Sequence, residues 1–205
     1  NFAGGTGTIS VNVSDNGTLG LGAISCGGSC GMSIDGTELQ NITVASLNLG
    51  NGSNGAVFVE GISAANSNNI SSTLTINSNN GISFDSSDST FNVLTLSAKD
   101  DIAINADLTI DAGNFNATAD SDSSGFGSFT LASGKTLSAT ASSGNVSVTA
   151  RDIINNGTIS AGTSGLVSLN DLNAPVIPTD EPTTDPTDTP ANPTDPLANP
   201  IVISE

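Results

Sequence analysis

The chain has 205 residues, 36% of them apolar, and a formal net charge of -17 at pH 7. Its only basic residues are Lys99, Lys135 and Arg151, which makes nucleic acids and anionic membrane surfaces poor partners. No run of about eighteen apolar residues occurs, so we expect no insertion into a membrane. Trp, Tyr and His are absent, and the small and β-branched residues that remain favour narrow, stacked sheets over helix bundles.

Residues 1–45 open the chain with short alternating runs. Apolar side chains recur at every second position, first at Ile9, Val11 and Val13 and then at Leu19 and Leu21. This is the period of a half-buried strand. The segment is predicted to form the first coils of the domain, a cap on it, or an acceptor for the end of the chain.

Cys26 and Cys30 are separated by three residues, two of which are Gly. This short, flexible spacer allows the two sulfur atoms to come within bonding distance. We therefore expect a disulfide, with free thiols as the alternative. Two cysteines without any histidine supply too few ligands for an ordinary metal site. We therefore expect no cofactor.

The middle of the chain repeats one short pattern, in which two apolar residues flank a small or polar one and Gly, Asn, Asp or Ser separates the segments. Each segment has the period of a strand with one buried face. They begin at Leu47, Val57, Leu74, Ile82, Leu94, Ile102, Leu108, Phe129, Leu137, Val146, Thr158 and Val167.

A longer period joins these segments. Leu74 and Leu94 are twenty residues apart, as are Ile82 and Ile102, and the pairs Leu108–Phe129 and Val146–Val167 are each twenty-one apart. An interval of this size is typical of a solenoid, here a parallel β-helix with about 20 residues per coil. Asn-Gly pairs would supply positive φ at its corners.

An antiparallel sandwich is the competing fold, because Asn-Gly between alternating runs is also a hairpin signal. A sandwich has no reason to keep a twenty-residue register, so the pattern favours the β-helix. The fold predicted is all-β, with a body over residues 1–170.

The sequence of residues 94–119, "LTLSAKDDIAINADLTIDAGNFNATA", resembles the repeats of filamentous haemagglutinin-type exoproteins, which are exported by two-partner secretion. The resemblance extends over roughly residues 45–170 and does not include the family's amino-terminal secretion domain. It implies a right-handed β-helix at a bacterial cell surface or in the extracellular matrix, with a role in adhesion or filament formation. It brings no catalytic residue with it.

Acidic residues cluster at Asp85–Asp88, Asp100–Asp101 and Asp120–Asp122. A polysaccharide-cleaving site would need cationic and aromatic partners that the chain largely lacks. We therefore interpret these pairs as solvated turn residues and expect no enzymatic activity. Calcium binding is the alternative, since carboxylates are its usual ligands, but the glycine-rich nonapeptide repeat is missing.

Residues 171–200 hold all eight prolines of the chain and no basic residue. This composition predicts an extended, hydrated linker. Beyond it, residues 201–205 begin with Ile201, Val202, Ile203 and Ser204, an apolar β-branched run typical of a strand.

A hydrophobic strand after a long linker suits addition to the open edge of a sheet. Three alternatives stand: donation to a neighbouring copy, capping of the same molecule, and a terminus without a partner. We expect donation, which makes the protein an extracellular, surface-located polymer of itself. A monomeric adhesin module that binds a host ligand or a surface or matrix polysaccharide is the second interpretation.

Overall fold

Eighteen strands, paired in parallel throughout, dominate the described part of the chain. The structure is a computed structural model that describes residues 2–13, 16–23, 26 and 30–173. The described residues belong to a compact unit, Asn1–Ala174. Because every strand pair is parallel, the antiparallel sandwich is excluded for this part of the chain.

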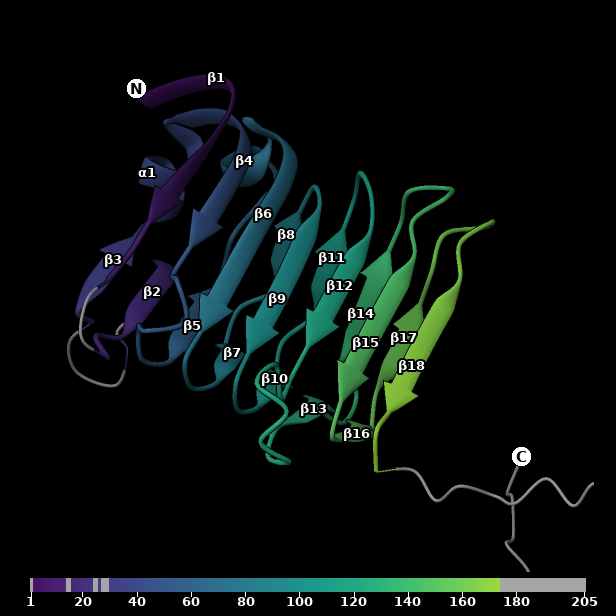
Figure 1. Ribbon diagram of the computed structural model, residues 1–205. Helices are drawn as coiled ribbons and strands as arrows, with labels where there is room; N and C mark the ends of the chain where they lie inside the picture. Colours follow the sequence, from purple (N-terminus) through teal and green to yellow (C-terminus); the bar gives the residue numbers. More distant parts are fainter. Residues whose placement is uncertain (1, 14–15, 24–25, 27–29, 174–205) are drawn as a thin grey trace, which may run out of the picture. The chain divides into compact units, whose positions relative to one another are not determined.

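The strands form three sheets, here called A, B and C in the order in which a coil visits them (Figure 1). Sheet A contains, in spatial order, β1 (Phe2–Val11), β4 (Ile42–Leu49), β6 (Ile70–Ser78), β9 (Leu94–Ala98), β12 (Phe115–Thr118), β15 (Val146–Ala150) and β18 (Val167–Asp171).

Sheet B contains β16 (Asp152–Asn155), β13 (Ser128–Leu131), β10 (Ile102–Ile104), β7 (Ile82–Phe84), β5 (Val57–Glu60), β2 (Leu19–Gly22) and β3 (Met32–Ile34). Sheet C contains β17 (Thr158–Ser160), β14 (Thr136–Ala139), β11 (Leu108–Ile110) and β8 (Ser89–Phe91). From β6 onward, consecutive strands pass from sheet A to B to C and back to A. Each strand therefore lies on the corresponding strand of the coil before it.

Two short helices take the position of sheet C in the early coils. Helix α1 (Gly36–Gln40) precedes β4, and α2 (Ala64–Ser67) precedes β6 and contacts both α1 and β8. A capping box starts α1: the Glu38 amide donates to the Asp35 carboxylate over 2.8 Å, and the Asp35 amide donates to the Glu38 carboxylate over 3.0 Å. The described residues contain no helix that is long and apolar enough to cross a membrane.

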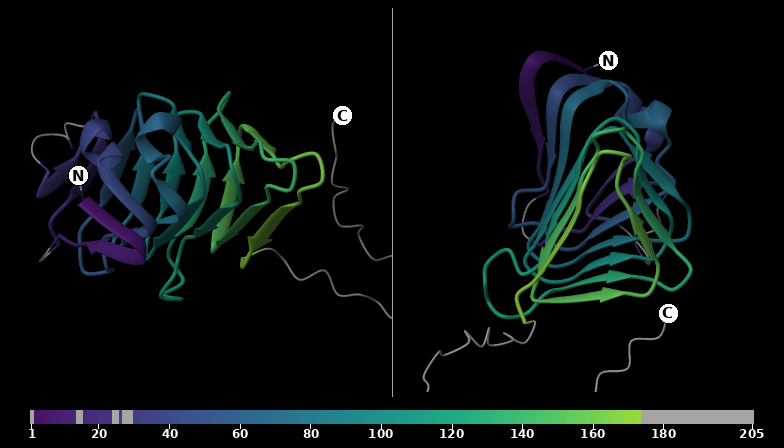
Figure 2. Two further views of the ribbon diagram at one scale, coloured as in Figure 1. Left: turned by 90° about the horizontal axis from the view of Figure 1, so that it is seen from above. Right: turned by 90° about the vertical axis from the view of Figure 1, so that its right-hand side faces the viewer.

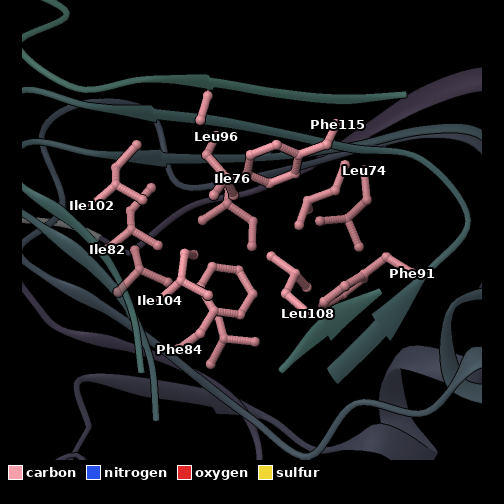
Figure 3. Packing of buried hydrophobic residues seen from close by; sticks show 14 of the residues in the cluster. Leu74, Ile76, Ile82, Phe84, Phe91, Leu96, Ile102, Ile104, Leu108 and Phe115 are labelled. Carbon is pink, nitrogen blue, oxygen red and sulfur yellow. The ribbon is translucent and has the colours of Figure 1, made fainter. Parts of the chain in front are cut away.

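The core lies between the three sheets, where inward side chains stack on their counterparts in the next coil (Figure 3). One such column runs along sheet B through Val57, Ile82, Ile102 and Phe129, each at most 1% exposed. In inner strands such as β9 and β13, alternate residues point outward, so that the strand buries one face. The right-hand view of Figure 2 shows the sheets from the end of the stack, enclosing this interior.

The pairing confirms three of the four predicted repeat intervals and corrects the fourth. Leu74 pairs with Leu94, Ile82 with Ile102 and Val146 with Val167. Leu108, however, pairs with Leu137, because the loop between β12 and β13 lengthens one coil without changing the register. The coil length is therefore not constant at about 20 residues.

Candidate assembly surface

Within the part of the chain that the structure describes, the last coil of the body presents three strand edges without a partner. β16, β17 and β18 are the final members of sheets B, C and A, and each is paired on one side (Figure 1). An unpaired edge exposes backbone N–H and C=O groups that another strand can use. The geometry of this coil therefore decides what the body can bind by strand addition.

β18 carries two inward apolar side chains on its exposed end face. Val167 and Leu169 lie in register over Val146 and Val148 of β15. The β15 residues are 0% exposed, whereas Val167 is 43% and Leu169 is 44% exposed. One more strand on β18 would bury the pair as β18 buries the residues beneath it, a gain of about 25 cal/mol per Å² of apolar surface.

Two neighbouring columns of the core end in polar side chains instead. Asn155 lies in register over Leu131, and Asp171 lies over Ala150. The Asp171 carboxylate accepts hydrogen bonds from the Ile153 amide at 3.2 Å and from the Asn173 amide at 2.9 Å. Polar groups thus cover part of the end face, and the exposed apolar surface of the inward side chains is concentrated on β18.

We call Val167 and Leu169, together with the flanking Leu166 and Leu172, the end patch. Leu166 is 74% and Leu172 is 56% exposed. Four of the seven large apolar side chains that are exposed in the described residues belong to this patch. Sequence reasoning missed it, although its signal was present: Val167 begins the last alternating segment before the prolines.

Asn side chains form hydrogen bonds that join the residue before β18 to the coils below. The Asn114 side-chain oxygen accepts from the Asn145 amide at 2.9 Å, and the Asn145 side-chain oxygen accepts from the Leu166 amide at 2.8 Å. Each amide group thereby satisfies a backbone donor of the next coil. β18 is consequently held in a regular register even though it lies at an edge.

The amino-terminal end of the stack is less regular. β1 pairs with β4 through two register shifts, between Ala3 and Gly5 and between Gly5 and Thr8. Its inward residues Ile9 and Val11 are already half-buried against the core. An incoming straight strand would find fewer matching positions here than along β18.

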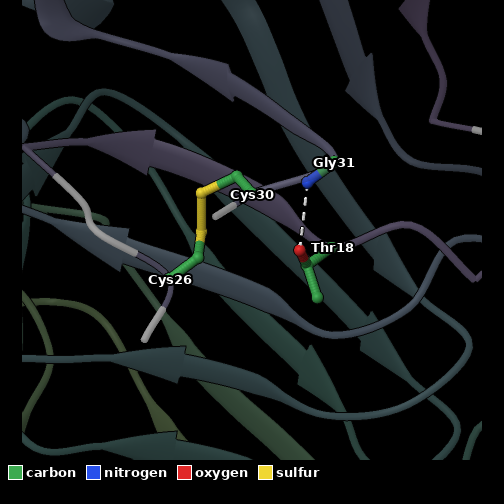
Figure 4. The surroundings of a disulfide bond; sticks show 4 residues. All are labelled: Thr18, Cys26, Cys30 and Gly31. Carbon is green, nitrogen blue, oxygen red and sulfur yellow. Dashed lines mark hydrogen bonds between the residues drawn. A yellow bond between two sulfur atoms is a disulfide. The ribbon is translucent and has the colours of Figure 1, made fainter. Parts of the chain in front are cut away.

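The predicted donor strand, Ile201, Val202, Ile203 and Ser204, lies outside the described residues, as does the linker after residue 173. The predicted cysteine pair lies at the other end of the chain. Cys26 and Cys30 are joined by a disulfide with Cα atoms 5.3 Å apart (Figure 4). Beside it, the Gly31 amide donates to the Thr18 hydroxyl at 3.1 Å, which ties this corner to the start of β2.

The acidic pairs mostly bind backbone or polar groups at the corners. Asp85 accepts from the Asn105 side chain at 2.8 Å, and Asp101 accepts from the Ser128 amide at 2.7 Å. Asp120, which is 6% exposed, accepts from Ser124 and Gly125 within its own loop. Among the described residues, no group of three or more His, Cys, Asp or Glu side chains is arranged to hold a metal ion.

A polar groove of about 330 Å³ crosses the early coils where sheet A turns toward sheet B. Among the described residues, Lys99 is the one charged side chain that lines it. The other lining residues are uncharged and small: Ser10, Asn12, Asn48, Gly50, Asn51, Gly52, Asn77, Ser78, Ser97 and Ser121. Such a surface offers hydrogen-bond donors and acceptors with little electrostatic field.

The chain matches no protein-family model, no curated protein and no solved structure. The resemblance of residues 45–170 to filamentous haemagglutinin-type repeats therefore stays a prediction.

Proposed function

We propose that this protein is a structural, non-enzymatic extracellular protein, a right-handed parallel β-helix that assembles into a surface fibre, filament or sheath. Its copies are linked when residues 201–204 of one copy add as a strand to the next. The observation that carries the proposal is the end patch, an apolar strand edge without a partner among the described residues. Donation in one direction gives a contact that need not close, which is how filaments form.

Three further features support this function. Consecutive strands cycle through three parallel sheets, which is the connectivity of a β-helix. A disulfide favours a location outside the reducing cytoplasm. The sequence after the body combines a proline-rich linker with a β-branched run, which together suit strand addition.

Electron microscopy tests the proposal. The purified full chain is compared by negative stain with a chain that ends at Pro200. We expect fibres from the full chain alone, because only it carries Ile201–Ser204. Equal behaviour of the two chains would contradict strand donation.

The polar groove favours a second function, that of a monomeric adhesin module that binds a surface or matrix polysaccharide. Its uncharged hydroxyl and amide groups suit a neutral sugar chain. Glycan-array binding by a chain that stays monomeric in light scattering would support this function over assembly.

A further inference from the structure

We propose that β18 is the acceptor edge, and that Ile201 and Ile203 of a neighbouring copy pack against Val167 and Leu169. This inference rests on the proposed function, since it names the surface that receives the donated strand. It goes further in predicting which side chains make the contact.

The spacing of the two partners matches. In β18, Val167 and Leu169 face inward and Ser168 between them faces outward, as the pairing with β15 requires. In the donor, Ile201 and Ile203 are likewise two residues apart, with Val202 between them. In either strand direction, a register exists that places both isoleucines over the two exposed inward side chains.

The other free edges fit the donor less well. β16 offers one inward apolar residue, Ile153, because Asn155 occupies its second inward position. β17 has three residues and one inward apolar side chain, Ile159. Within the described coils, β18 is the regular edge on which two inward apolar side chains at alternate positions are both more than 40% exposed.

Charge also favours this end of the body. Residues 1–98 contain no Lys or Arg, whereas residues 174–205 carry six carboxylate side chains: Asp180, Glu181, Asp185, Asp188, Asp195 and Glu205. Arg151 lies beside the end of β18, where its guanidinium donates to the Asn173 side chain at 3.0 Å. Arg151 partly offsets the carboxylates of Asp152 and Asp171 there, so an acidic segment is repelled less from this end than from the amino-terminal coils, which carry acidic groups alone.

The linker favours a neighbouring copy over the same molecule. Residues 174–200 would span on the order of 80 Å at the rise of polyproline II, about 3.1 Å per residue. The edge of the same β18 lies within roughly 17 Å, the length of a five-residue strand. Eight prolines and mutually repelling carboxylates oppose the chain reversal that this short return requires.

The test uses two full-length variants with complementary defects. Leu169→Asp places a charge in the acceptor, and the double variant Ile201→Asp/Ile203→Asp places charges in the donor strand. Ser168→Asp and Val202→Asp are matched controls, because the same charge then points away from the core. Size-exclusion chromatography with light scattering gives the assembled fraction of each chain and of a 1:1 mixture, and circular dichroism checks folding.

We expect wild type and both controls to assemble. Each defective variant alone should need at least about a tenfold higher concentration to assemble, because a buried unpaired charge opposes strand addition. Their mixture should form a 1:1 complex, since one chain still donates and the other still accepts. If Leu169→Asp does not fold, Leu169→Asn replaces it with the same expectation.

The contrary outcomes separate the two proposals. Assembly of Leu169→Asp at wild-type concentration, with the donor variant defective, would overturn β18 as the acceptor and leave strand donation standing. A monomeric mixture beside assembled wild type would contradict both proposals, because an intact donor strand would then fail to add to an intact neighbour. A wild-type chain that remains monomeric would overturn both.

Discussion

The glycines of the Asn-Gly pairs do not all serve the purpose that the sequence predicts, which is positive φ at a corner. Left-handed backbone occurs at Asn16, with φ 58°, and at Gly52, with φ 75°. Gly55 and Gly157 do not adopt it. At Gly157 an added Cβ would collide with the carbonyl oxygen of Lys135 in the coil below. There, glycine is needed because two coils approach closely rather than for its conformational freedom.

This difference predicts effects of different size for the same substitution at two corners. Gly157→Asn should lower the free energy of unfolding by about 1–3 kcal/mol, because the coils must separate. Gly134→Asn should change it by less than about 1 kcal/mol, since Gly134 has φ 71° with open space around it and Asn tolerates that conformation. Urea unfolding measures both. Equal losses would contradict the steric explanation.

Within the strands, alternation separates positions that bear on stability from positions that face solvent. Phe129 of β13 is 0% exposed and makes an edge contact with Phe115, with ring centroids 6.4 Å apart. Thr130, the next residue, points outward. Because each buried side chain touches its counterparts in adjacent coils, its loss affects more than one coil.

Phe129→Ala should therefore lower the free energy of unfolding by about 3–5 kcal/mol through the cavity it leaves. Thr130→Ala is the matched control on the same strand and should cost less than about 1 kcal/mol. Both changes in unfolding free energy are obtained from the denaturant midpoints, provided that the unfolding free energy of the variants depends on denaturant concentration with the same slope. A similar loss of unfolding free energy from the two substitutions would mean that packing of the inward side chains does not dominate the stability of the coil.

At the scale of the whole molecule, the body and the remaining sequence have complementary features. The body ends in an apolar edge, and residues 201–203 supply apolar side chains at the matching interval. Anything that binds the folded state alone raises its stability in proportion to the logarithm of its concentration. Donation between copies and capping within one copy therefore respond differently to dilution.

The thermal midpoint of the full chain should rise with protein concentration if strands are exchanged between copies. Ile201→Asp/Ile203→Asp should show a midpoint that does not depend on concentration. Calorimetry over a hundredfold range of concentration checks this. A concentration-independent midpoint for both chains would favour capping within one molecule or no insertion at all.

The sequence by itself determined the local pattern: alternating side chains predict strands, and a repeated interval predicts stacked coils. These follow from neighbouring residues, because one buried face imposes a period of two. The disulfide between Cys26 and Cys30 is equally local, since its partners are four positions apart. The linker that prolines and carboxylates predict lies outside the described residues and stays a prediction.

The tertiary structure alone decided which segments pair. Lengthening a loop costs little entropy and leaves the hydrogen-bond register intact, so sequence distance does not identify the partner of Leu108. It also decided that α1 and α2 replace sheet C in the early coils, and that Val167 and Leu169 lie at an exposed edge. Exposure of an inward residue depends on whether another strand lies above it, and no local pattern contains that information.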